Sequence, residues 1–139
     1  MENFIIRSHK KEDIPLVFNS FTGCMRASIS YRGCVDRIFY RNISKLFKGW
    51  FNVSDVLIIH PEGQPDVVAG WIVYCDTTIV FSYVKFSYRK RGLFTALLKA
   101  AGVNKSGVQY IFSTFAATLH AEKYGWSFNP FRQSTPPEG

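Results

Sequence analysis

Residues 84–94, Val-Lys-Phe-Ser-Tyr-Arg-Lys-Arg-Gly-Leu-Phe, join an apolar segment, Ile79–Phe86, to a segment with a helical pattern, Leu93–Ala101. The first is rich in β-branched and aromatic residues, which is typical of a strand. The first turn of a helix has N–H groups without partners and the positive end of the helix dipole, so it can bind phosphate. Gly92 lets the backbone come close to a ligand. The stretch therefore predicts a strand-to-helix turn that binds an anion.

Positive charge is concentrated around this turn. The chain has 139 residues, with 17 Lys and Arg against 10 Asp and Glu, and a formal net charge of +7. No acidic residue occurs between Thr77 and Ala121, whereas this segment holds Lys85, Arg89, Lys90, Arg91, Lys99 and Lys105. Such an asymmetry indicates an anionic partner, which could be nucleic acid, an acidic protein or a phosphorylated cofactor. Charge alone does not choose among the three.

The remaining segments alternate between strand and helix patterns and predict an α/β fold. Three central apolar segments are expected to be strands that are covered on both faces, and Asp76-Thr77-Thr78 is expected to join the last two as an antiparallel hairpin. The expected strands are Phe4–Arg7, Val56–His60, Val67–Cys75, Ile79–Phe86, Val108–Ser113 and a short one within Trp126–Phe131. One expected helix begins at Ile14-Pro15. Three others cover Tyr31–Trp50, Leu93–Ala101 and Ala116–Tyr124.

Composition limits the class of protein. We expect a single domain over residues 1–132 and a disordered tail over 133–139, because the tail holds nothing to bury. No apolar run is long enough for a membrane span, and the N-terminus has no signal-peptide pattern. The cysteines and histidines have no metal-ligand spacing, so we expect no metal and a cytoplasmic protein with reduced thiols.

The segment Tyr31–Trp50 predicts an amphipathic helix with a basic face. Its apolar stripe consists of Phe39, Ile43, Leu46, Phe47 and Trp50, and its basic stripe of Arg37, Arg41, Lys45 and Lys48. The basic stripe is interpreted either as a solvated surface or as a contact for an acidic substrate or a nucleic-acid backbone.

Residues 84–98 resemble the acetyl-CoA-binding motif of the GNAT family of N-acetyltransferases, Val-x-Pro-x-Tyr, then Arg/Gln-x-x-Gly-x-Gly/Ala, then a helix with paired leucines. The pair Arg7 and Asp13 is similar to the family's first strand and helix. Residues 117–126 resemble its Ala-x-x-x-Tyr-x-Lys-x-Gly-Phe segment. The resemblance covers residues 4–128 and implies a short, divergent member. The implied fold is a mixed, mostly antiparallel central sheet with helices on both faces, truncated after the fourth helix.

The resemblance also implies a cofactor, acetyl-CoA, and an amine substrate that attacks the bound thioester directly. Ser82, Tyr83 and Val84 would lie beside the pantetheine arm. The pyrophosphate would be cradled by the turn residues Arg89, Lys90, Arg91, Gly92, Leu93 and Phe94. The substrate would bind beside the first two helices, near Cys24–Trp50.

Several positions depart from the family pattern. Phe86 replaces a proline, Phe94 replaces a small residue, and Thr114 replaces an asparagine. Ala121 stands where the family has the tyrosine that protonates the leaving thiolate, and alanine cannot act as an acid. The candidate catalytic residues are therefore Tyr83, His120 and Tyr124. The fourth expected strand, Ile79–Phe86, has no carboxylate that could accept the proton of the amine. Asp36, Asp55 or Asp76 could accept it only through a water molecule.

Two functions remain open from the sequence. The first is an acyl-CoA-dependent N-acetyltransferase that acts on an amine of a protein or small molecule. The alternative is a catalytically inactive protein of this fold, viral or from a mobile element, that binds an acidic protein or nucleic acid through its basic surface.

Overall fold

The computed structural model describes residues 3–28, 31–103 and 107–138; Lys105 and the last residue of the tail, Gly139, lie outside them. Strands and helices follow one another in the order that the sequence predicts. They are β1 (Phe4–Ser8), α1 (Ile14–Arg26), α2 (Asp36–Phe51), β2 (Asp55–Pro61), β3 (Gly70–Cys75), β4 (Thr78–Val84), α3 (Leu93–Ala101), β5 (Gln109–Tyr110), α4 (Phe115–Tyr124) and β6 (Ser127–Phe128).

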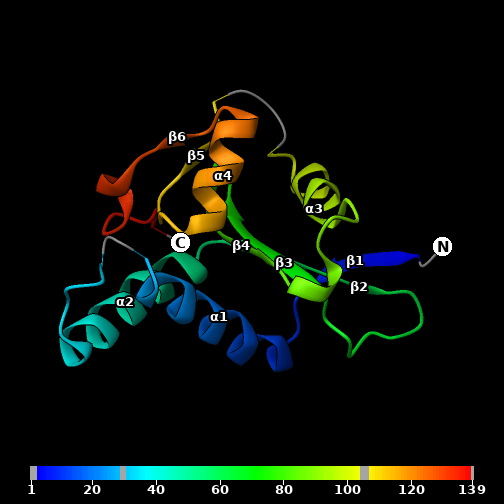
Figure 1. Cartoon of the computed structure of the whole chain (residues 1–139), viewed down its shortest axis with the longest axis horizontal. Helices are drawn as coiled ribbons and strands as arrows, with labels where there is room; N and C mark the ends of the chain where they lie inside the picture. Colours follow the sequence, from blue (N-terminus) through cyan, green and yellow to red (C-terminus); the bar gives the residue numbers. More distant parts are fainter. Residues whose placement is uncertain (1–2, 29–30, 104–106, 139) are drawn as a thin grey trace.

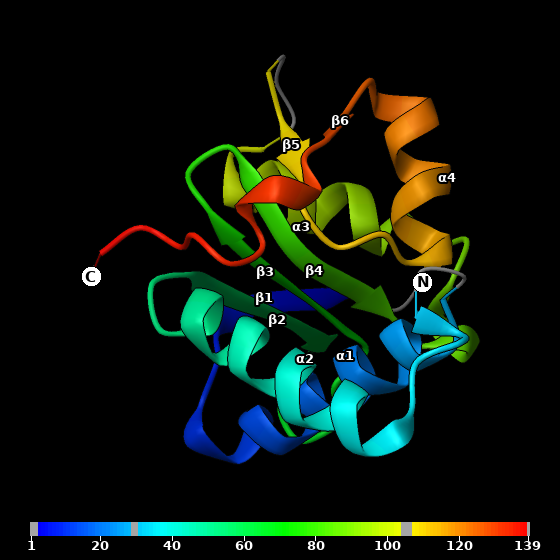
Figure 2. The ribbon, with the colours of Figure 1, turned by 90° about the vertical axis from the view of Figure 1, so that its left-hand side faces the viewer.

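The strands form one mixed sheet in the order β1-β2-β3-β4-β5-β6. The first three pairs are antiparallel, whereas β4–β5 and β5–β6 are parallel. Helices α1 and α2 cover one face of the sheet, and α3 and α4 cover the other (Figures 1 and 2). The mostly antiparallel sheet between two helical layers confirms the predicted fold class.

The two faces of the sheet pack in two different hydrophobic clusters. Trp71 and Val73 of β3 point toward α1 and α2, while Ile72 between them points toward α3. This alternation follows from the two-residue period of a strand. Stacking of Phe21 on Phe47, with ring centroids 4.0 Å apart, joins α1 to α2 within the first cluster. The central strands are therefore apolar throughout because both of their faces are buried.

Helix α2 has the two faces that its sequence predicts. Phe39, Ile43, Phe47 and Trp50 are buried and Leu46 is half-buried. The basic stripe is exposed along its length: Arg37, Arg41, Lys45 and Lys48. No helix among the described residues is both long and apolar enough to span a bilayer.

The predicted hairpin between β3 and β4 is confirmed, with small corrections to its bounds. Cys75 pairs with Thr78, so the turn holds only Asp76 and Thr77, and Asp76 takes a positive φ of 50°. Strand β3 begins at Gly70 rather than at Val67. Strand β5 is likewise shorter than predicted, because the residues after Tyr110 remain buried but leave the ladder. An apolar pattern indicates burial, and burial does not require strand pairing.

Strand β4 carries a bulge that opens the sheet. Val73 pairs with Phe81 and Tyr74 with Ile79, which leaves Val80 as an extra residue in β4. A bulge bends its strand and increases the local twist. Strand β5 pairs with β4 only at Thr78 and Ile79, before the bulge. Beyond it, the edge of β4 that faces away from β3 pairs with no described strand.

The end of the described chain packs against α2 and the sheet. The Trp50 indole N–H donates to the Gln133 carbonyl at 3.0 Å, and the Gln133 amide donates to the Ile111 carbonyl at 2.8 Å. Arg132 donates to the Thr78 hydroxyl at 2.7 Å. These contacts hold the chain as far as Gln133, the first residue of the segment that the sequence analysis expects to be a disordered tail.

An ion pair ties the first strand to the first helix. Arg7 donates to the Asp13 carboxylate at 2.8 and 3.3 Å, and the Lys10 backbone N–H donates to the same carboxylate at 2.7 Å. Burial by itself would raise the pKa of Asp13, but the hydrogen bonds and the charge of Arg7 outweigh it and hold that pKa below its usual value of 3.8. Arg7 also donates to the Pro65 carbonyl, which fixes the β2–β3 connection.

Asp13→Asn should lower the free energy of unfolding at pH 7 by about 2 kcal/mol, because it removes a charge-assisted pair that is partly buried. The depressed pKa of Asp13 stabilises the fold above pH 3.8, and this contribution is lost as the pH falls through the lower, folded pKa. The difference between the variant and the parent should therefore shrink in acid. Urea titrations across pH measure it, with exposed Glu12→Gln as the control, and a difference that is constant with pH would contradict the assignment.

Candidate functional site

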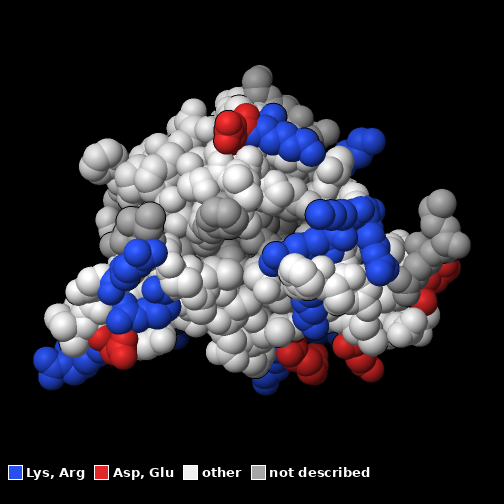
Figure 3. Space-filling model, viewed as in Figure 1, with Lys and Arg blue, Asp and Glu red and all other residues white. Residues whose placement is uncertain are grey.

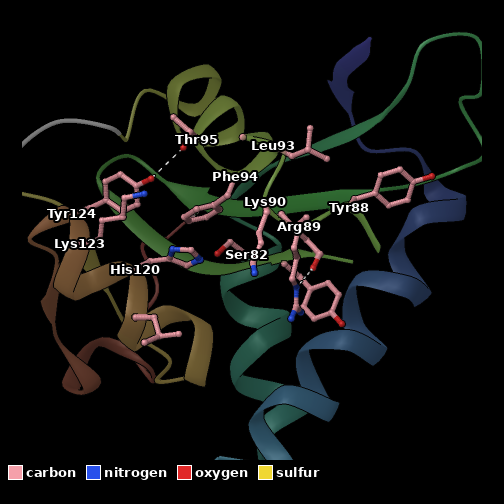
Figure 4. A pocket seen from close by; sticks show the side chains of 14 residues that line it. Ser82, Tyr88, Arg89, Lys90, Leu93, Phe94, Thr95, His120, Lys123 and Tyr124 are labelled. Atoms are coloured by element: carbon pink, nitrogen blue, oxygen red, sulfur yellow. Dashed lines mark hydrogen bonds between the residues drawn. The ribbon is translucent and has the colours of Figure 1, made fainter. Parts of the chain in front are cut away.

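A pocket of about 490 Å³ lies where β4 separates from β5. Its walls come from the end of β4, the turn before α3, the first turn of α3 and one side of α4. Figure 4 shows side chains from all of these elements converging on it, with Phe94 and His120 at its centre. The bulge in β4 thus creates the space, and two helices close it.

The first turn of α3 lines this pocket, and no side chain among the described residues caps its backbone N–H groups. Gly92 is the N-cap residue of α3 with φ +77°, and no side chain caps the helix. The amides of Leu93, Phe94 and Thr95 form the first helical turn, whose N–H groups have no partner inside a helix. A Cβ built on Gly92 would meet no atom within 4 Å, so there is open space in front of the turn.

Positive charge surrounds the same turn. Arg89 and Lys90 line the pocket from the turn, and Lys123 lines it from α4. Figure 3 shows Lys and Arg side chains gathered beside the start of α3, on the face that Figure 1 presents. None of the described residues that line the pocket is acidic. The electrostatic potential in the pocket therefore favours an anion.

Aromatic and titratable groups from α4 form the opposite wall. The His120 ring stacks on Phe94 with centroids 3.8 Å apart. Burial, together with the charge of Lys123, lowers the pKa of His120, so its imidazole is neutral at pH 7 and can accept a proton. The Tyr124 hydroxyl lies 3.2 Å from the Thr95 hydroxyl, which ties α4 to the first turn of α3.

The structure brings nearly all of the sequence-predicted site residues to this one pocket. Every residue expected to contact the cofactor lines it except Arg91, which lies over the Tyr88 ring at 5.4 Å. The three catalytic candidates Tyr83, His120 and Tyr124 line it as well. Their roles in catalysis stay predictions.

Four pocket residues were missed from the sequence: Tyr88, Thr95, Leu119 and Lys123. Two of them follow from helical spacing, because Lys123 lies three residues after His120 and Thr95 directly follows Phe94 in the first turn. The predicted carboxylates do not reach the pocket. Asp36 forms an ion pair with Arg26, and Asp55 and Asp76 lie at the start of β2 and in the β3–β4 turn. Among the described residues, no cluster of three or more His, Cys, Asp or Glu could hold a metal ion.

Two of the positions that depart from the family pattern have structural roles. The Thr114 hydroxyl accepts a hydrogen bond from the Ala117 N–H at 3.1 Å and caps α4, as an asparagine would. Ala121 is only 9% exposed and packs in the cluster that holds Leu97 and Trp126. The packing of α4 on the sheet therefore favours a small side chain at position 121.

Comparison with known proteins supports the fold alone. The chain matches no protein-family model, and no curated protein matches it in sequence. Among solved structures, it is similar to an N-acetyltransferase from Staphylococcus aureus Mu50, with 18% identity, a TM-score of 0.52 and coverage of 88% of this chain and 82% of that one. It is also similar to a possible acetyltransferase from Clostridium difficile 630, with 14% identity, a TM-score of 0.56 and coverage of 89% and 90%.

The chain has the GNAT fold. At these identities the likeness establishes architecture alone, and it confirms the fold that the sequence resemblance implies. Within the GNAT fold of this chain, the pocket lies at the separation of β4 from β5, beside the motif at residues 84–94.

Ala121→Tyr should destabilise the protein by about 1–3 kcal/mol, because the larger ring would overpack a filled contact. Thermal unfolding measures the change, with Glu122→Tyr on the exposed side of α4 as the matched control. A variant as stable as the parent would show that position 121 has room for the family's tyrosine and would contradict the packing role.

Proposed function

We propose that this chain is an N-acetyltransferase that uses acetyl-CoA to acetylate a primary amine. The observation that carries the proposal is the uncapped first turn of α3, which opens through Gly92 into a basic pocket at the free edge of β4. A phosphate-bearing ligand with an extended, amide-containing arm fits both of these features. The fold supports the same assignment, because one solved neighbour is named an N-acetyltransferase and the other a possible acetyltransferase.

The turn suits a pyrophosphate on chemical grounds. The N–H groups of Leu93, Phe94 and Thr95 would donate to phosphate oxygens, and the helix dipole favours negative charge there. Lys90 and Lys123 add positive charge from two sides of the pocket. Gly92 has no side chain to block the approach, and Phe94 contributes its amide while its ring stacks on His120.

The free edge of β4 suits the pantetheine arm. Ser82, Tyr83 and Val84 lie beyond the bulge, on the edge without a strand partner among the described residues. The backbone groups of such an edge can bind an added extended chain, as a sheet binds another strand. Ser82 is 9% exposed, so a ligand beside it would be shielded from water.

Acetyl-CoA would supply the acetyl group as a thioester. A neutral amine would attack the thioester carbonyl and form the new C–N bond. The C–S bond would break, and the thiol would leave with a proton. Neutral His120 is the group in the pocket best suited to accept the proton of the amine. Tyr124 and Tyr83 supply hydroxyl groups that could donate a proton. The pocket itself would contribute by holding the reactants in line.

The second candidate is a catalytically inactive protein of the same fold that binds an acidic protein or nucleic acid. The observation that favours it is the exposed basic stripe of α2, which lies outside the pocket. This candidate predicts no acetyl transfer and no requirement for Gly92.

Gly92→Val should abolish stabilisation of the protein by CoA, because a branched side chain would fill the space in front of the turn. The variant should also lose about 1–2 kcal/mol of stability, because valine is strained at a positive φ. Gly102→Val is the matched control, since Gly102 ends the same helix at φ +72° with equally open space around it.

The readout is the shift in melting temperature on adding CoA, together with acetyl transfer from acetyl-CoA to amines. CoA at 100 times its dissociation constant should raise the free energy of unfolding of the parent and of Gly102→Val by about 2.7 kcal/mol. Equal CoA binding by both variants would show that the phosphate site lies elsewhere. No CoA binding by the parent would reject the enzyme and leave the second candidate.

A further inference from the structure

Three contacts orient the exposed side chain of Arg89, which lines the pocket. Its Nε donates to the Val84 carbonyl at 2.9 Å. Its guanidinium carbon lies 5.5 Å from the centroid of the Tyr83 ring and 5.7 Å from that of the Phe86 ring. A planar cation beside two aromatic rings and hydrogen-bonded through one edge has lost much of its conformational freedom.

The guanidinium lies on the α1–α2 side of the sheet, away from the first turn of α3. Tyr83 packs against the cluster between the sheet and α1–α2, whereas its neighbour Val84 packs against the cluster under α3. The charge of Arg89 also acts on Cys24 of α1, where it partly opposes the rise in the pKa of that thiol caused by burial. Figure 4 shows Arg89 extending from the turn toward α1 and α2, while Phe94 and Thr95 lie on the side of α3.

The outer edge of this guanidinium is available to a ligand. The structure gives its two Nη atoms no hydrogen bond and no ion pair with any residue in 3–28, 31–103 or 107–138. Two parallel N–H groups of an arginine match the two oxygens of a carboxylate. Phe86, which is 83% exposed, provides an apolar surface beside them.

We propose that Arg89 binds a carboxylate of the amine acceptor, and that the acceptor is therefore an anionic α-amine: an acidic amino acid or a peptide that begins with acidic residues. This inference rests on the proposed function and assigns Arg89 to the acceptor instead of the cofactor. The two parts of the basic turn then serve different ligands, with Lys90 beside the phosphates and Arg89 beside the acceptor.

No described residue that lines the pocket carries a carboxylate, which favours a weakly basic amine as acceptor. Only the neutral amine attacks a thioester, and at pH 7.5 about a third of the N-terminal α-amine of a peptide is neutral, against about one in a thousand of lysine side chains. Positive surroundings lower the pKa of a bound amine further. A polycationic acceptor would instead be repelled by Arg89, Lys90 and Lys123.

The test uses free glutamate and three C-terminally amidated peptides, which begin Glu-Glu, Gln-Gln and Lys-Lys. We expect kcat/KM for the Glu-Glu peptide to exceed that for Gln-Gln by roughly tenfold to a hundredfold, the range of a charge-assisted hydrogen bond. The Lys-Lys peptide should be the poorest acceptor. Comparison of glutamate with the Glu-Glu peptide separates a small-molecule acceptor from a peptide acceptor.

Arg89→Gln should reduce the ratio of Glu-Glu to Gln-Gln acetylation to about one and remove stabilisation of the protein by the Glu-Glu peptide. The melting-temperature shift caused by CoA should persist in this variant. Lys90→Gln is the matched control: it should weaken CoA binding and keep the preference for Glu-Glu.

Loss of CoA binding in Arg89→Gln, or an unchanged preference for Glu-Glu, would overturn the assignment of Arg89. Failure of the parent to bind CoA would reject the proposed function, whereas binding of the Glu-Glu peptide measured without CoA still tests Arg89. If that peptide does not stabilise the parent, the acceptor assignment is wrong.

Discussion

The early separation of β4 from β5 is the constraint on which the rest of the site depends. The extra residue Val80 bends β4, and the two strands pair only at Thr78 and Ile79. If β5 paired with β4 along its whole length, hydrogen-bonded backbone would fill the gap and leave no space beside Ser82. Because the strands diverge, α4 lies across the opening, and the first turn of α3 faces it. The sheet therefore provides a rigid scaffold and, at one edge, an open binding surface.

The pocket has two sides with different chemistry. On the side of α3, backbone N–H groups and lysines favour phosphate groups, and on the side of α1 and α2, Arg89 lies between aromatic rings with its outer edge available. The proposed reaction needs both, because a cofactor and an acceptor must meet at the edge of β4. In the proposed reaction His120, whose pKa is lowered by burial and by the charge of Lys123, would accept the proton of the amine.

The sequence predicts the order of elements because each has a local cause: Pro15 at the start of α1, Gly102 at the end of α3, and alternating burial of β3. The sequence predicts the turn at Arg89–Phe94 for the same reason, because its glycine and its charged residues are contiguous. The bulge at Val80 has no local signature, because Ile79, Val80 and Phe81 are all apolar. The separate orientation of Arg89 depends on Tyr83 and on α1, and the burial of Ala121 depends on Trp126, so neither could be predicted from spacing.

The central claim is that the first turn of α3 binds the pyrophosphate of CoA. The most direct measurement is a titration of the isotope-labelled protein with CoA, followed through its backbone amide resonances. The account predicts the largest shifts for the amides of Gly92, Leu93, Phe94 and Thr95, and little change along the basic stripe of α2. Shifts centred on Arg37–Lys48 with an unaffected first turn of α3 would contradict it.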